Sequence, residues 1–272
     1  MSILNHPLKA FPMWALFGLA AAIGLFASLM RPTNLYADWC IIREGLAQGT
    51  SLYSPHIALL LPHLLLSCEA GAALNGILFI WVPLWLVRHF DGDLGSALLV
   101  LGNPATIFGV LLSQLDWLPA LVWLLPAPLA GIAFAAKPQT VLGCLLTWLE
   151  KRAWSNFLSA GAAGVLGVAI GGAWWHNIGA LDAGAAIWNI APFPMGLPFG
   201  LWLLWRAWQE RHLPVEKAAI LAPLISPYFA LYSLTPVLAV VAAKQRKWAI
   251  WLVLGLFYLT LFIARRDAVI LR

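Results

Sequence analysis

Long apolar runs, separated by short clusters of Lys and Arg, constrain this chain more than any other feature of its sequence. Residues 11–30 form an apolar stretch of about 20 residues, which is the length that a helix needs to cross a bilayer. Of the 272 residues, 62% are hydrophobic and 10% are charged, whereas soluble domains carry about 25% charged residues. We therefore predict an all-α integral membrane protein rather than a water-soluble domain.

The basic residues lie between the apolar runs, and their placement predicts the topology. The clusters are Arg88, residues 151–152, residues 206–217 and residues 244–247. Cytoplasmic loops are rich in Lys and Arg, so we place these loops and the N-terminus in the cytoplasm. The net charge of +5 is explained by these loops, and we expect no nucleic-acid partner. The basic tail at residues 265–266 disagrees with this topology, because it would lie on the outer side of the membrane. Either one segment is miscounted or the tail bends back along the surface.

We expect about ten transmembrane or re-entrant helices in a single domain, residues 1–272, with polar outer loops near residues 31–56 and 174–195. The first apolar stretch is too long for the core of a signal peptide, so we interpret it as an uncleaved span. No organellar targeting segment is apparent, which favours a bacterial inner membrane.

The stretch between Asp116 and Glu150 is broken by prolines into apolar pieces of about 10 residues. Each piece would extend only ~15 Å as a helix, half of a ~30 Å hydrocarbon core. Short helices are tolerated at that depth only where protein shields them or where they line a wet cavity. Two longer, kinked helices are the alternative that the prolines equally allow.

The cysteines and histidines do not indicate a metal site or a disulfide framework. The three cysteines have no CxxC or Cys/His spacing, so we expect ordinary buried thiols at Cys40, Cys68 and Cys144. The histidines that a metal could recruit lie far apart, at His56, His63 and His176. We therefore predict no metal and no cofactor.

Charged and polar groups at the edge of a membrane core are costly, which makes them functional candidates. Asp38, next to aromatic residues, could act as a general base toward a hydroxyl, or it could be a loop acid or a helix N-cap. Asp116 suits an N-cap equally well. Lys137 would either bind a phosphate as a point charge or extend to the lipid headgroups. Tyr228 follows a helix break at Pro227, where a proline kink with an interfacial Tyr is the alternative.

Four short motifs occur in an order that matches a known family. They are Asp38 with Gly49-Thr50-Ser51-Leu52-Tyr53-Ser54-Pro55, then Ser113-Gln114-Leu115-Asp116, then Lys137-Pro138-Gln139, and finally Ser226-Pro227-Tyr228 with Tyr232. Together they resemble the motifs of GT-C superfamily membrane glycosyltransferases. The branch they are most similar to is that of the bacterial mannosyltransferases that use polyprenyl-phosphate-mannose. The resemblance covers roughly residues 11–245.

The resemblance implies an inverting glycosyl transfer from a polyprenyl-phosphate sugar at the outer face of the membrane. Asp38 would be the catalytic base that deprotonates the acceptor hydroxyl, and Lys137 would contact the donor phosphate. The remaining substrate-binding positions would be Asp116, Gln114, Tyr228 and Tyr53. Membrane lipids and the donor's polyprenyl chain, lying in a lateral cavity between the broken helices, are the expected partners.

The chain also departs from the family pattern. Ser113 replaces the usual glycine, the chain is shorter than typical members, and no DxD pair points to a metal. A non-catalytic subunit or scaffold bound to a membrane protein partner is therefore an alternative. A small-solute transporter built on broken helices is another, weakened by the lack of repeat symmetry. Asp116 and Lys137 near the bilayer centre would favour transport.

Overall fold

Helices make up the whole regular structure of the part of the chain that the computed structural model describes. The described residues are 3–31, 38–48, 56–57, 66–171, 189–192, 194–226 and 229–270. Over these residues the chain forms thirteen α-helices and no β-strand, which confirms the all-α class.

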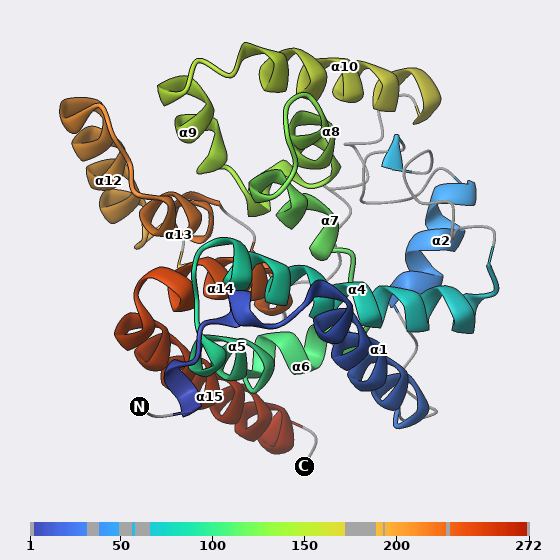
Figure 1. The fold of residues 1–272 in the computed structure, drawn as a ribbon. Coiled ribbons are helices and arrows are strands. Elements are labelled where there is room, and N and C mark those ends of the chain that lie inside the picture. Colours follow the sequence, from blue (N-terminus) through green and yellow to red (C-terminus); the bar gives the residue numbers. More distant parts are fainter. Residues whose placement is uncertain are drawn as a thin grey trace.

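Helix α4 (Cys68–His89) lies at the centre of the fold. It begins at Ser67, whose hydroxyl accepts a hydrogen bond from the backbone N–H of Ala70 at 3.2 Å. Helix α1 (Met13–Leu29) packs along it, and α14 (Leu234–Lys244) packs on it from another side (Figure 1). Both α4 and α14 are apolar around most of their circumference, as expected of helices that other helices enclose.

Residues 94–112 form two helices. Helix α5 (Leu94–Leu101) and helix α6 (Pro104–Leu111) meet at an angle of 58°. The break has a local cause. Asn103 caps α6 by accepting from Thr106 N at 3.1 Å, and Pro104 occupies the first helical position, where its missing N–H costs nothing.

The region between Asp116 and Glu150 consists of short helices, as one of the two sequence interpretations predicted. Helix α7 (Trp117–Ala120) continues into the 3-10 turn η4 (Leu121–Trp123), followed by α8 (Leu129–Ala136) and α9 (Cys144–Glu150). The alternative of two longer helices is wrong. Helix α8 packs on α10 (Trp154–Gly171) so closely that a Cβ at Gly131 would lie 2.1 Å from the Asn156 carbonyl oxygen.

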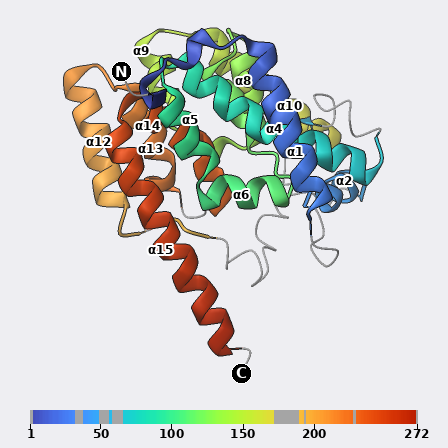
Figure 2. The ribbon, with the colours of Figure 1, turned by 60° about the horizontal axis from the view of Figure 1, so that its bottom comes forward.

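The remaining helices are α2 (Asp38–Gln48), α12 (Leu197–Glu210), α13 (Val215–Ile225) and α15 (Arg246–Ile270). Helix α15 is unbroken over 25 residues and extends away from the rest of the protein toward the C-terminus (Figure 2). The tail therefore does not bend back within residues 246–270.

Few helices match the expectation of about ten spanning or re-entrant segments. Among the described residues, α4 and α10 are long and apolar enough to cross a membrane, and the bent pair α5–α6 would make a third span. Helix α1, with 17 residues, would extend about 25 Å, short of a ~30 Å hydrocarbon core. Ten crossings are thus not confirmed.

The basic segments gather on one face, which we call the basic face. Lys9 pairs with Asp91 at 2.5 Å, and the charges of Lys9, Lys151 and Lys244 all act on the His89 imidazole. The end of α9 joins the chain after α12 through a hydrogen bond between Glu150 Oε1 and His212 Nδ1, which lie 2.8 Å apart. This common face was expected from the placement of Lys and Arg.

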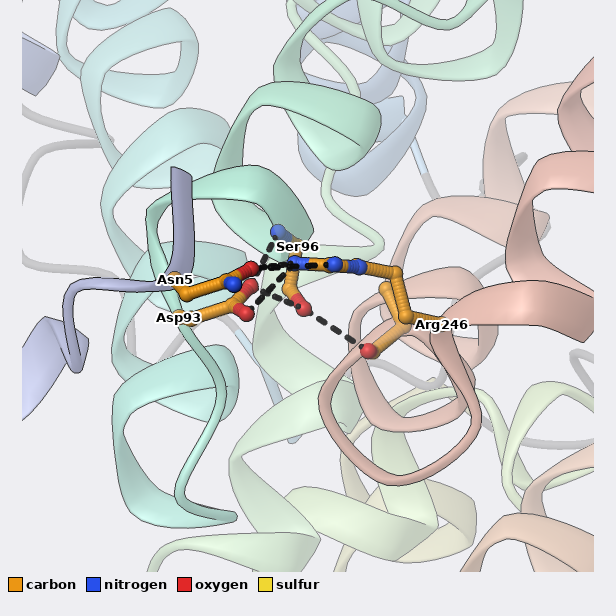
Figure 3. Close-up of polar contacts among 5 residues, drawn as sticks. Asn5, Asp93, Ser96 and Arg246 are labelled. Carbon is orange, nitrogen blue, oxygen red and sulfur yellow. Dashed lines mark hydrogen bonds and ion pairs between the residues drawn. The ribbon is translucent and has the colours of Figure 1, made fainter. Parts of the chain in front are cut away.

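At the basic face, an arginine at the start of α15 joins the N-terminal segment to the start of α5 (Figure 3). Arg246 donates to Asp93 at 2.6 Å and to the Asn5 side chain at 3.1 Å. Asp93 also caps α5, since it accepts from the Ser96 N–H at 2.8 Å. The Ser96 hydroxyl in turn donates to the Ala242 carbonyl of α14 at 2.8 Å.

The cysteine prediction is wrong for two of the three residues. Cys40 of α2 and Cys68 at the start of α4 form a disulfide, with their Cα atoms 5.4 Å apart. Trp39 is fully buried in the same contact, and a Cβ on Gly71 would lie 2.2 Å from its indole nitrogen. Only Cys144 is the free, buried thiol that was expected.

Candidate functional site

Asp116 and Lys137 form a buried ion pair. The Lys137 Nζ lies 3.0 Å from Asp116 Oδ1 and 3.1 Å from Oδ2, and the two side chains are 10% and 0% exposed. A charge removed from water is tolerated only when it is paired and hydrogen-bonded. Each residue of the pair thus neutralises the buried charge of the other, and the sequence had singled out both residues separately.

The local backbone explains why the Asp116 carboxylate is available for this contact. Asp116 precedes α7 in the N-cap position, but its φ and ψ of −65° and −9° are helical and its side chain makes no capping bond. An N-cap residue typically has extended φ and ψ, which lets its side chain reach the N–H groups of the first turn. The N-cap interpretation is therefore wrong for the side chain.

Lys137 lies at the break between α8 and the 3-10 turn η5 (Pro138–Thr140). Its backbone is not helical (φ −158°, ψ 72°), because Pro138 disfavours the helical conformation in the residue before it. Its carbonyl accepts from the Thr140 hydroxyl at 2.9 Å. The ammonium thus ends inside the protein and does not extend to lipid headgroups.

Two residues of a further segment complete the cluster. The Ser233 hydroxyl donates to Asp116 Oδ1 at 2.5 Å, and the Lys137 ammonium lies 5.3 Å from the centre of the Tyr232 ring. Both belong to the 3-10 turn η7 (Leu231–Ser233), which precedes α14. We call Asp116, Lys137, Tyr232 and Ser233 the buried polar cluster. Tyr232 was part of a sequence motif, whereas no sequence signal pointed to Ser233.

The cluster is anchored to the central helix through the residue after Asp116. The Trp117 indole donates to Asn75 Oδ1 at 2.9 Å, and the Asn75 amide donates to the Gly71 carbonyl at 3.0 Å. Asn75 is fully buried in α4. The start of α7 is thus held against α4 by a hydrogen bond as well as by apolar packing.

Ser113 ends helix α6 in the left-handed conformation, with φ 55°. Its N–H donates to Val110 O at 3.1 Å, and the Gln114 N–H donates to Gly109 O at 2.9 Å. These two bonds define a Schellman motif, in which glycine is the usual residue at this position. The Arg31 guanidinium binds the Ser113 hydroxyl and the Leu111 carbonyl, the latter at 2.7 Å. Gln114 itself is buried, two positions before Asp116.

The side chains of the other predicted site residues lie outside the part of the chain that the structure describes. Asp38 begins α2, and its side chain lies outside the described atoms. Tyr53 and Tyr228 lie outside the described residues, as do His63 and His176. Among the described residues, no group of three His, Cys, Asp or Glu side chains could hold a metal ion.

An open hollow in the described part of the chain lies away from this cluster. It has a volume of about 770 Å³ and is lined by Trp205, Trp208, Gln209 and Arg211, none of which was singled out from the sequence. The buried polar cluster does not line it. The lateral cavity implied for a polyprenyl chain thus stays a prediction.

Comparison with known proteins identifies no matching family model, curated protein or solved structure.

Proposed function

We propose that this protein is a GT-C-like membrane glycosyltransferase that moves a sugar from a polyprenyl-phosphate donor to an acceptor hydroxyl. Asp38 would act as the base, and Lys137 would hold the donor phosphate. The basic face would lie in the cytoplasm of a bacterial cell and the opposite end, with α2, at the outer face of the inner membrane.

One observation carries the proposal. Residues of three motifs that are far apart in sequence meet in the buried polar cluster: Asp116 from the second, Lys137 from the third and Tyr232 from the fourth. Such convergence is what a shared substrate site requires. The left-handed backbone of Ser113 adds support, because it explains why the corresponding motif position is usually glycine.

The proposal is tested with the purified protein in lipid nanodiscs. Polyprenyl-phosphate-mannose labelled in the sugar is added with a membrane extract as the source of acceptor, and release of the sugar from its carrier is measured. Asp38→Asn should keep the fold and lower transfer at least a hundredfold, within the range that a general base contributes. Glu44→Gln is the matched control, since it removes the same charge from the same helix and should leave transfer unchanged.

If Asp38→Asn turns over the donor at the normal rate, the transferase proposal is wrong. If the unaltered protein releases no sugar while a verified mannosyltransferase does so in the same assay, it is also contradicted for this donor.

A non-catalytic scaffold is the second candidate, and the closure of the ion pair favours it. Asp116 already neutralises Lys137, whose side chain is 10% exposed, so a phosphate would have to open the pair to reach the ammonium. A scaffold predicts that the protein co-purifies with a membrane protein partner in constant ratio. It also predicts that Asp38→Asn and Glu44→Gln leave that ratio unchanged.

A further inference from the structure

Helix α12 lies at the edge of the fold (Figure 1), and it exposes a row of aromatic side chains. Phe199, Trp202, Trp205 and Trp208 follow one another at intervals of three residues and are 52%, 47%, 53% and 84% exposed. Residues at this spacing form a ridge along one side of a helix. The opposite side, with Gly200 and Leu203, is buried, and α12 packs on α13.

The ridge ends in the hollow at the C-terminal end of α12. Trp205 and Trp208 supply its apolar walls, and Gln209 and Arg211 supply an amide and a guanidinium. Trp is the residue that collects where hydrocarbon meets headgroups. The hollow thus combines a wall suited to glycerol and the upper acyl chain with donors suited to a phosphate.

The charges around the hollow leave Arg211 available for an anion. Arg206 is paired with Glu210 within α12, and Glu150 is paired with His212. Among the described residues Arg211 makes no ion pair, and it is exposed. The C-terminal end of a helix carries partial negative charge, so an anion can bind here only through side chains.

We propose that this hollow binds the phosphate headgroup of an anionic phospholipid from the leaflet at the basic face. The guanidinium of Arg211 would hold the phosphate, the Gln209 amide would donate to its ester oxygens, and an acyl chain would lie along the aromatic ridge. A free phosphate would not use the ridge, which favours a lipid as the occupant. The inference is independent of the transfer reaction and of Asp38.

The backbone supplies a clean variant for the test. Arg211 ends α12 in the left-handed region, with φ 48°, and Arg152 after α9 has the same conformation, with φ 53°. Glycine adopts this conformation without strain. Arg211→Gly therefore removes the guanidinium while preserving the turn. Arg152→Gly is the matched control, because it removes one arginine from the same face without altering the hollow.

Native mass spectrometry of the full chain released from detergent measures lipid adducts with added phosphatidylglycerol or phosphatidylcholine. We expect at least a fivefold preference for phosphatidylglycerol, lost in Arg211→Gly and restored in Arg211→Lys, while Arg152→Gly changes it less than twofold. Thermal unfolding confirms that each variant is folded.

Three outcomes would overturn the proposal. If the two glycine variants lose the preference for phosphatidylglycerol equally, general positive charge attracts the lipid. Equal binding of phosphatidylcholine would exclude recognition of an anionic headgroup. Displacement of phosphatidylglycerol by millimolar inorganic phosphate would mean that the hollow is a site for free anions.

Discussion

Lys137 and Asp116 are 21 positions apart, yet the ammonium lies 3.0 and 3.1 Å from the two carboxylate oxygens in the interior of the protein. Each belongs to a break between short helices, and the Ser233 hydroxyl at the start of α14 contacts the same carboxylate. The pair thus joins three breaks in the helical structure, whichever chemistry it serves.

Removing one member of this pair should destabilise the protein strongly. Asp116→Asn or Lys137→Met leaves the other charge buried and unpaired, at a cost of about 3–5 kcal/mol. The double variant should be less destabilised than the sum of the two single variants. Thermal or denaturant unfolding in nanodiscs measures this, and Lys9→Met, at the exposed pair with Asp91, is the control with a much smaller effect. Strict additivity of the two changes would contradict the pairing.

The Ser233 hydroxyl should contribute to the same cluster. Ser233→Ala removes a hydrogen bond to a charged group, which typically contributes about 1.5–3 kcal/mol. In the background of Asp116→Asn the same change should cost clearly less, because the charged acceptor is gone. The measurement is the unfolding free energy of four proteins: the unaltered chain, Ser233→Ala, Asp116→Asn and the double variant. An equal cost in both backgrounds would show that Ser233 acts independently of Asp116.

Ser113 should tolerate glycine better than alanine. Both changes lose the bond with Arg31, but glycine adopts φ 55° without the strain of about 1–2 kcal/mol that a Cβ brings. Ser113→Gly should therefore be more stable than Ser113→Ala by about 1 kcal/mol. Thermal unfolding of the two variants side by side tests which is more stable. A more stable Ser113→Ala would exclude a left-handed backbone at Ser113.

The disulfide predicts a count of reactive thiols. In denatured, unreduced protein a maleimide-polymer reagent should label one cysteine, Cys144, whereas reduction should raise the number to three, which a gel shift reads directly. The two cysteines are 28 positions apart, and closing a loop of that size stabilises the fold by about 3.5 kcal/mol in the chain-entropy model. Cys40→Ser should lower the unfolding free energy by a comparable amount. Three labels without reduction would contradict the bond.

Acid should release the contact of Lys9 with Asp91. The hydrogen bond from Lys9, and then its charge, lower the pKa of the Asp91 carboxyl below its usual range. The contribution of this contact to the stability of the fold is therefore complete above the ordinary aspartate pKa of about 3.9. It disappears as the pH falls through the lowered pKa of Asp91. Carbon NMR of labelled aspartate should show the Asp91 pKa rising in Lys9→Met. An unchanged pKa would mean that Lys9 does not contact it.

The lengths of the apolar runs and the positions of Pro, Lys and Arg determined the helical class, the breaks at residues 126–128 and 137–138, and the common basic face. These are local properties, since helix length, proline breaks and the location of charge depend on neighbouring residues and on the solvent. Tertiary structure alone decided which polar groups meet. Asp116 fits an N-cap in sequence, and Cys40 and Cys68 have no diagnostic spacing. The packing of α7, α8 and η7 brings Asp116 to its partners, and the packing of α2 against α4 brings the two cysteines together. Partners so far apart in sequence are selected by the shared core, because no local pattern relates them.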